Sequence, residues 1–120
     1  MLMLPPSVKI VLAVQPVDLR RSFDGLAEAA RAVLAQDPFS GHLFVFRNKR
    51  GNRIKLLFWD RSGFVIWYKR LEQGYFRWNL ARSAGSGAGM EVSAPELALL
   101  LEGIDLGSAK RQCRYARPEV

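Results

Sequence analysis

Three strand-like runs follow one another in the middle of the chain, separated only by short turn segments. The runs cover residues 42–47, 54–59 and 64–71. Residues 48–52 have the composition of a hairpin loop, and residues 60–63 have that of a tight turn. Connections this short leave no room for the chain to cross over a sheet, so successive runs must pair antiparallel. This meander is the strongest constraint on the fold.

Further elements flank the meander. Residues 8–14 are mostly apolar and predict a first strand, and residues 22–36 carry the apolar stripe of a helix. After the third run, residues 75–78 predict a short continuation strand and residues 90–92 a last one. A helix beginning after residue 93 ends the predicted domain.

The two predicted helices carry different N-terminal signals. Either Ser22 or Asp18 is expected to cap the first helix. Ser93 and Glu96 stand at the spacing of a capping box ahead of the last helix, and Gly103 is its expected C-cap. The apolar positions of the last helix recur at helical spacing: Leu97, Leu100, Leu101 and Ile104. One face of this helix is therefore expected to pack on the core.

These elements predict a single α+β domain over residues 1–107, with an antiparallel sheet of about four to five strands and two main helices covering one face. A chain of 120 residues that is 49% hydrophobic is large enough to bury one core. Residues 83–89 are all glycine, alanine or serine and predict a flexible loop. Residues 108–120 predict a basic, mobile tail.

Positive charge is concentrated in one segment. Residues 47–82 hold ten of the 18 lysines and arginines but only two of the 11 acidic residues, and the rest of the chain is nearly neutral. This asymmetry indicates a surface for a polyanion, and DNA is the expected partner. The residues predicted to contact nucleic acid are Arg47, Lys49, Arg50, Arg53, Lys55, Arg61, Lys69 and Arg70. A solvated loop or an acidic protein partner is the alternative for the hairpin cations.

Aromatic side chains are interleaved with these cations. Side chains alternate between the two faces of a strand, so Lys55 and Trp59 share a face of their strand, and Trp67 and Lys69 share a face of the next. We expect both pairs on the same sheet face, where Trp59 and Trp67 would stack on bases. The alternative is that these aromatic residues are structural and pack in the core.

The sequence lacks the residue sets of common catalytic and metal sites. One cysteine, Cys113, and one histidine, His42, do not supply a zinc site or a nucleophilic triad. Asp18, Asp24 and Asp60 are the candidates for a metal-dependent nuclease, although helix capping and turn formation already account for them. We therefore expect a protein without enzyme activity, metal or cofactor.

The sequence also bears on location. The apolar N-terminal stretch contains two prolines and Lys9 and lacks a cleavage site, which disfavours a secretory signal. No apolar run approaches the ~20 residues of a membrane span. With a single cysteine and no expected contact with a membrane, a reducing cytoplasm is the expected location.

Three uninterrupted strings identify a family. They are VDLRRSFDGL from Val17, DPFSGHLFVFRNKRGNRIKLLFWD from Asp37, and LLEGID from Leu100. The chain resembles, over about residues 4–105, the accessory protein encoded by the second open reading frame of insertion sequence 66 elements. That protein is called TnpB and is distinct from the RNA-guided nuclease of the same nickname. The matching residues of most interest are Asp18, Arg20, Phe23, Asp24, Gly25, Phe39, Gly41, Arg47, Lys55, Trp59, Asp60, Lys69 and Arg70.

The resemblance implies a protein needed for transposition of a bacterial mobile element, in which a separate transposase cuts and joins the strands. The element-encoded transposase or another companion protein is then an expected partner, alongside DNA. Two alternatives stay open beside DNA binding through the basic hairpin. One is a protein–protein adaptor that docks on the transposase with little DNA contact, and the other is the metal-dependent nuclease.

Overall fold

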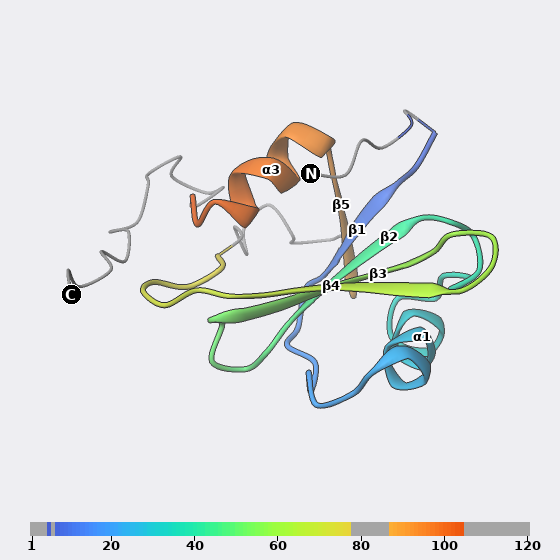
Figure 1. Cartoon of the computed structure of the whole chain (residues 1–120), viewed down its shortest axis with the longest axis horizontal. Helices are drawn as coiled ribbons and strands as arrows, with labels where there is room; N and C mark the ends of the chain where they lie inside the picture. Colours follow the sequence, from blue (N-terminus) through green and yellow to red (C-terminus); the bar gives the residue numbers. More distant parts are fainter. Residues whose placement is uncertain (1–4, 6, 78–86, 105–120) are drawn as a thin grey trace.

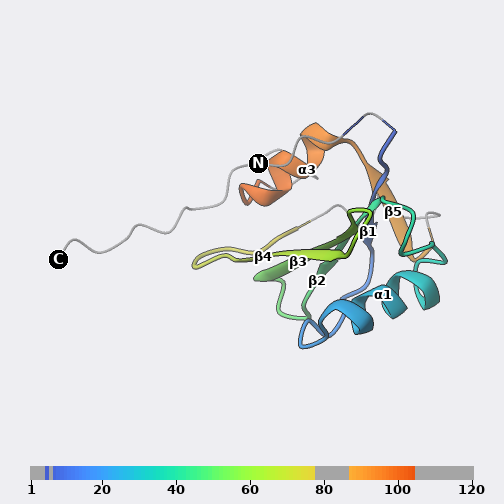
Figure 2. The same cartoon turned by 45° about the vertical axis from the view of Figure 1, so that its right-hand side comes forward.

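Five strands form one mixed sheet in the order β4-β3-β2-β1-β5, with a helix on each face (Figures 1 and 2). The computed structural model describes residues 5, 7–77 and 87–104. The strands are β1 (Ile10–Ala13), β2 (Leu43–Arg47), β3 (Arg53–Trp59), β4 (Phe64–Arg70) and β5 (Gly89–Val92), and the helices are α1 (Phe23–Ala32) and α3 (Ala94–Leu101). The predicted α+β class and the number of strands are confirmed.

One pairing departs from the predicted antiparallel sheet. The central hairpins β2–β3 and β3–β4 are antiparallel, as the short turns require, and β5 is antiparallel to β1. Strand β1, however, runs parallel to β2, with Ile10 opposite Leu43. The physical reason is the connection between them, which contains α1 and is long enough to cross over the sheet.

The two helices cover opposite faces of the sheet, so the prediction that both lie on one face is wrong (Figure 2). Alternate residues of β1 show why. Ile10 and Leu12 belong to the cluster that includes α3, whereas Val11 and Ala13 belong to the cluster that includes α1. A strand that is apolar at every position is typical of burial on both faces.

Helix α1 is shorter than predicted. It ends at Ala32, and Ala35 has a positive φ of 53°, a backbone conformation that does not continue a right-handed helix. Ser22 occupies its N-cap position without a side-chain cap hydrogen bond. Asp18 does not cap the helix either, because its carboxylate is bonded to Arg20.

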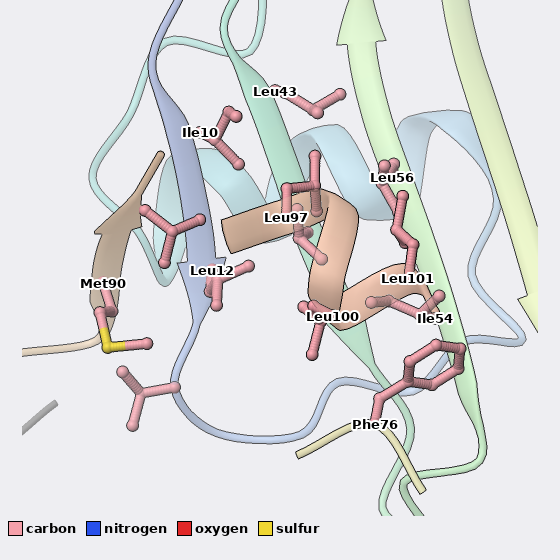
Figure 3. Packing of buried hydrophobic residues seen from close by; sticks show 13 residues of the cluster. Ile10, Leu12, Leu43, Ile54, Leu56, Phe76, Met90, Leu97, Leu100 and Leu101 are labelled. Carbon is pink, nitrogen blue, oxygen red and sulfur yellow. The ribbon is translucent and has the colours of Figure 1, made fainter. Parts of the chain in front are cut away.

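Helix α3 begins as predicted. The Ser93 hydroxyl accepts a hydrogen bond from the Glu96 N–H at 3.2 Å, and the Glu96 carboxylate accepts one from the Ser93 N–H at 3.0 Å. This capping box directs Leu97, Leu100 and Leu101 onto the sheet (Figure 3).

The predicted continuation strand over residues 75–78 is not present in its described part. Residues 75–77 lie outside any strand, and residue 78 lies outside the described residues, as do most of the predicted loop 83–89 and the whole tail 108–120. Phe76 is nevertheless 1% exposed and packs in the α3 cluster (Figure 3). Among the described helices, none combines the length and apolarity needed to cross a membrane.

Candidate nucleic-acid interface

The β3–β4 register separates the two tryptophans. Lys55 pairs with Tyr68, Leu56 with Trp67, and Trp59 with Phe64. Residues paired across strands share a face, so Lys55 and Trp59 lie on the α1 face while Trp67 lies on the α3 face. The prediction that Trp59 and Trp67 share one face is therefore wrong.

The cause is the length of the turn. The Asp60 N–H donates to the Gly63 carbonyl at 3.0 Å, which closes a loop of two residues, Arg61 and Ser62. A two-residue loop pairs each odd-numbered residue of β3 with an even-numbered residue of β4. Placing odd-numbered residues of both strands on one face would require a loop with an odd number of residues.

An open groove of about 1040 Å³ lies between the segment after β1 and the β2–β3 turn. It is lined by Gln15, Pro16, Val17, Asp18, Leu19, Arg20, Asn48, Lys49, Arg50, Arg53, Lys55 and Tyr68. Four of the eight predicted cations line it, and the segment after β1 adds a fifth cation. Asp18 is its one acidic residue. The groove is therefore strongly electropositive.

The turn that carries two of these cations is held by a side chain. The Asn48 Oδ1 accepts hydrogen bonds from the Gly51 N–H at 2.9 Å and the Arg53 N–H at 3.1 Å. Gly51 has a φ of +84°, a conformation that glycine adopts without strain. Lys49 and Arg50, at the tip of this turn, are exposed. A turn fixed in this way presents both cations at the rim of the groove.

An exposed aromatic ring, that of Tyr68, lies beside two groove cations, Arg53 and Lys55. Tyr68 is 48% exposed, and its hydroxyl accepts a hydrogen bond from Arg53 Nη1 at 2.8 Å. The Lys55 ammonium lies 4.8 Å from the centre of the Tyr68 ring and donates to the Arg21 carbonyl at 3.1 Å. These contacts hold the ring and two cations together on the α1 face.

The opposite wall of the groove carries an ion pair. Arg20 Nε and Nη2 both donate to the Asp18 carboxylate, the shortest contact being 2.8 Å. The hydrogen bond from the Arg20 side chain lowers the pKa of Asp18 to about 2. Asp18 therefore stays ionised above that pH and neutralises part of the positive charge of Arg20.

Arg47 is placed differently from the other predicted cations. Its half-buried guanidinium donates to the Val14 carbonyl at 3.3 Å and to the Phe76 carbonyl at 3.4 Å, and burial lowers its pKa. The Arg47 carbonyl also accepts from the Val17 N–H at 2.9 Å. Arg47 thus ties the end of β1 and the segment after β4 to β2.

Three more predicted cations lie outside the groove. Lys69 Nζ donates to the Leu101 carbonyl at 2.7 Å, at the C-terminal end of α3. Arg70 is paired with Glu72 at 2.7 Å. Arg61 is exposed in the β3–β4 turn, at the far end of β3 from Arg53, about 25 Å away along an extended chain. These positions do not converge with the groove.

The two tryptophans also lie away from the groove. Trp59 packs in an aromatic cluster with Phe39 and Phe64, with ring centres 5.0 and 5.0 Å from its own. Trp67 is 37% exposed on the α3 face. The ring that the structure places among the cations is Tyr68, which was not among the predicted site residues. Arg20 was named only as a match to the family, without a predicted contact to nucleic acid. A sequence signal was available for Tyr68 alone, because the even-numbered turn places it on the same face as Lys55.

The acidic residues considered for a nuclease do not gather. Asp18 is paired with Arg20, and the Asp60 carboxylate accepts hydrogen bonds from the Ser62 and Gly63 N–H groups within its turn. The described part of the chain contains no group of three or more histidine, cysteine, aspartate or glutamate side chains able to hold a metal. His42 Nδ1 accepts a hydrogen bond from the Lys9 N–H at 2.9 Å.

Comparison with known proteins gives one family and two close relatives. The family model described as IS66 Orf2 like protein matches residues 8–111. The protein y4jC of Sinorhizobium fredii is 38% identical over 112 residues, covering 92% of each chain. The protein y4hO of the same organism is 36% identical over 99 residues, covering 82% of this chain and 83% of the relative. No solved structure gave a significant match.

Proposed function

The chain belongs to the IS66 Orf2-like family, and from this membership we propose that it is a non-catalytic accessory protein that binds DNA in the basic groove. The family implies an accessory role in transposition of an insertion sequence. Within that role, the groove supports binding rather than catalysis, since its polar side chains are mainly cations and amides.

The observation that carries the proposal is the convergence of five cations and one exposed ring. Lys49, Arg50 and Arg53 approach from the hairpin, Lys55 from β3, and Arg20 from the facing segment. Cations neutralise phosphates and release condensed counterions, while an exposed ring stacks on bases without regard to sequence. The groove therefore supports nonspecific or weakly specific DNA binding that weakens as salt is added.

The direct test removes three groove cations. We expect a variant with Lys49, Arg50 and Arg53 all changed to Ala to bind DNA at least about tenfold more weakly at low salt. Its salt dependence should flatten by about 2–3 in the slope of log K against log [salt], since each lost duplex phosphate contact removes about 0.9. Fluorescence anisotropy with labelled single-stranded and duplex DNA over a salt series measures both quantities.

A matched control removes the same charge elsewhere. Changing Lys9 and Arg31 to Ala and Arg61 to Gly takes three exposed cations from outside the groove. This control should retain most of the affinity and the slope. Equal losses of affinity in the two variants would mean that the net charge of the chain, not the groove, drives DNA binding. Unchanged DNA binding by the groove variant would mean that the groove is not the DNA-binding surface.

A second variant should strengthen binding. Asp18→Asn removes the charge that pairs with Arg20, so one more cation of the groove becomes available to a phosphate. We expect higher affinity and a salt slope steeper by about 0.9. The same anisotropy series measures this, with Asp24→Asn, an exposed acid outside the groove, as the control. Weaker binding by Asp18→Asn would show that the ion pair is needed to position Arg20.

An adaptor role is the second candidate, favoured by a separate surface. Phe39 is 51% exposed and packs against Trp59 and Phe64, forming an aromatic cluster outside the groove. Exposed aromatic residues are enriched in protein interfaces. Co-elution with the transposase of the element, lost on Phe39→Ala, together with no DNA binding by the chain alone, would select the adaptor. Nicking of DNA with Mg²⁺ or Mn²⁺ that depends on Asp60 would select the nuclease.

A further inference from the structure

Strand β4 is an edge of the sheet with an apolar and aromatic composition. It lies at one end of the strand order and pairs with β3 alone (Figure 1). Its seven residues include Trp67, which is 37% exposed, and Tyr68, which is 48% exposed. Long apolar edge strands are templates for pairing with another strand unless they are protected.

The hydrogen bonds at both ends of the β3–β4 ladder show which backbone groups are at the free edge. The Leu71 N–H donates to the Asn52 carbonyl at 2.8 Å, and the Asp60 N–H to the Gly63 carbonyl at 3.0 Å. In an antiparallel ladder every second pair is hydrogen-bonded, so the odd-numbered residues of β4 bond to β3. The even-numbered residues present their N–H and C=O groups outward: Phe64, Ile66, Tyr68 and Arg70.

These outward groups are open in the part of the chain that the structure describes. Among the described residues, their backbone N–H and C=O groups form no hydrogen bond to any other segment. Lys69 points onto the α3 face near the end of the strand, but residues 64–68 contain no charged side chain, proline or bulge. The usual protections of an edge strand are therefore missing from residues 64–68.

We propose that β4 pairs with β4 of a second copy of this chain, antiparallel and centred on Trp67. In this register Phe64 faces the partner's Arg70, Ile66 faces the partner's Tyr68, and Trp67 faces the partner's Trp67. All four outward residues of each strand then form hydrogen-bonded pairs. The contact is the same on both copies, as a twofold dimer requires, and it joins two five-stranded sheets into one of ten strands.

A second copy fits this edge because β4 is complementary to itself, and the register centred on Trp67 is the one that pairs all four outward residues of both strands. The centred register places Arg70 opposite a phenylalanine and Lys69 opposite Val65, so no like charges face one another. Shifting the twofold axis to Lys69 or Arg70 would place identical cations directly opposite, which is destabilising. The central pairs, Ile66 with Tyr68 and Trp67 with Trp67, are aromatic or β-branched on both sides, a pairing that is favourable across strands.

The geometry has a consequence for the groove. Edge-to-edge pairing about a twofold axis perpendicular to the sheet keeps corresponding faces on the same side. Tyr68 and Lys55 of the two copies would therefore lie on one continuous face. The dimer does not depend on DNA, and the two properties respond oppositely to salt, because screening reduces repulsion between two chains of net charge +7 while it weakens DNA binding.

The first test uses charges at the twofold axis. We expect the wild-type chain to sediment as a dimer of twice 13.5 kDa at high protein concentration and raised salt. Trp67→Lys and Trp67→Glu should each dissociate at least about tenfold more readily, since each places like charges opposite one another. An equimolar mixture of the two should restore dimers. A merely structural role of Trp67 predicts no such rescue, and circular dichroism checks that both variants are folded.

The second test fixes the register with a disulfide. In a Cys113→Ser background, Trp67→Cys places two thiols at a non-hydrogen-bonded pair, where Cα atoms are about 4.5 Å apart and a disulfide is allowed. It should form covalent dimers on mild oxidation. Val65→Cys, which faces the partner's Lys69, should not.

Two results would overturn the proposal. The first is a wild-type chain that stays monomeric at all concentrations at raised salt. The β4 edge would then not pair with a second copy and would be available only to a strand of another protein. The second is a dimer that neither Trp67 charge variant weakens, which would place the interface elsewhere.

Discussion

Replacing Phe76 by Ala is expected to lower the free energy of unfolding by about 3–5 kcal/mol. The ring is 1% exposed and lies beside Ile54 and Leu100 beneath α3, although its backbone belongs to no strand (Figure 3). Its removal leaves a cavity that strand-borne side chains, fixed by the sheet, are poorly able to fill. Urea denaturation followed by circular dichroism measures the loss.

The matched control is Leu99→Ala, on the helix α3 that covers Phe76. Leu99 is 44% exposed on α3, so its truncation should cost less than about 1 kcal/mol. A Phe76→Ala loss as small as that of the control would contradict the placement of this ring in the core. It would then also question the position of residues 75–77, whose Phe76 N–H donates to the Gly51 carbonyl at 2.7 Å.

Local signals in the sequence predicted the elements that depend on neighbouring residues. The capping box of Ser93 and Glu96 forms with both hydrogen bonds, and the two central hairpins have the predicted turns. In each case the interacting groups are at most a few residues apart. Sequence spacing alone is then sufficient, because the chain geometry leaves few alternatives.

Features that depend on distant segments were not predicted. The parallel pairing of Ile10 with Leu43 joins residues on either side of α1, and the choice of sheet face for each helix depends on which side of β1 is left uncovered. The face of Trp67 depends instead on a local feature, the even number of residues between Trp59 and Phe64, which pairs odd-numbered positions of β3 with even-numbered positions of β4. A register shift of one residue reverses every side chain.

Only the local part of the candidate site was predicted from the sequence. The hairpin that carries Lys49, Arg50 and Arg53 is a local feature, and its cations do line the groove. The facing wall with Arg20 comes from a segment about 30 residues earlier, which no spacing rule connects to the hairpin. Nothing in the sequence distinguishes Arg47 from Arg53, since both are arginines at a strand end of the same hairpin.

Arg47→Ala is the variant that separates these two arginines. We expect it to lower the free energy of unfolding by about 2–3 kcal/mol, because the Val14 and Phe76 carbonyls lose their charged donor in a half-buried setting. Arg53→Ala, whose side chain bonds only to the exposed Tyr68 hydroxyl among described residues, should cost less than about 1 kcal/mol. Thermal and urea unfolding of both variants measure the difference.

DNA binding should rank the two variants in the opposite order. At a temperature where both are folded, Arg53→Ala should bind DNA more weakly than wild type, with a flatter salt slope, whereas Arg47→Ala should keep both. Arg47→Lys should remain destabilised, since one ammonium cannot reproduce a guanidinium that reaches two carbonyls. Weakened DNA binding by a fully folded Arg47→Ala would show that this residue contacts the nucleic acid after all, and that its carbonyl partners are exchanged for phosphate on binding.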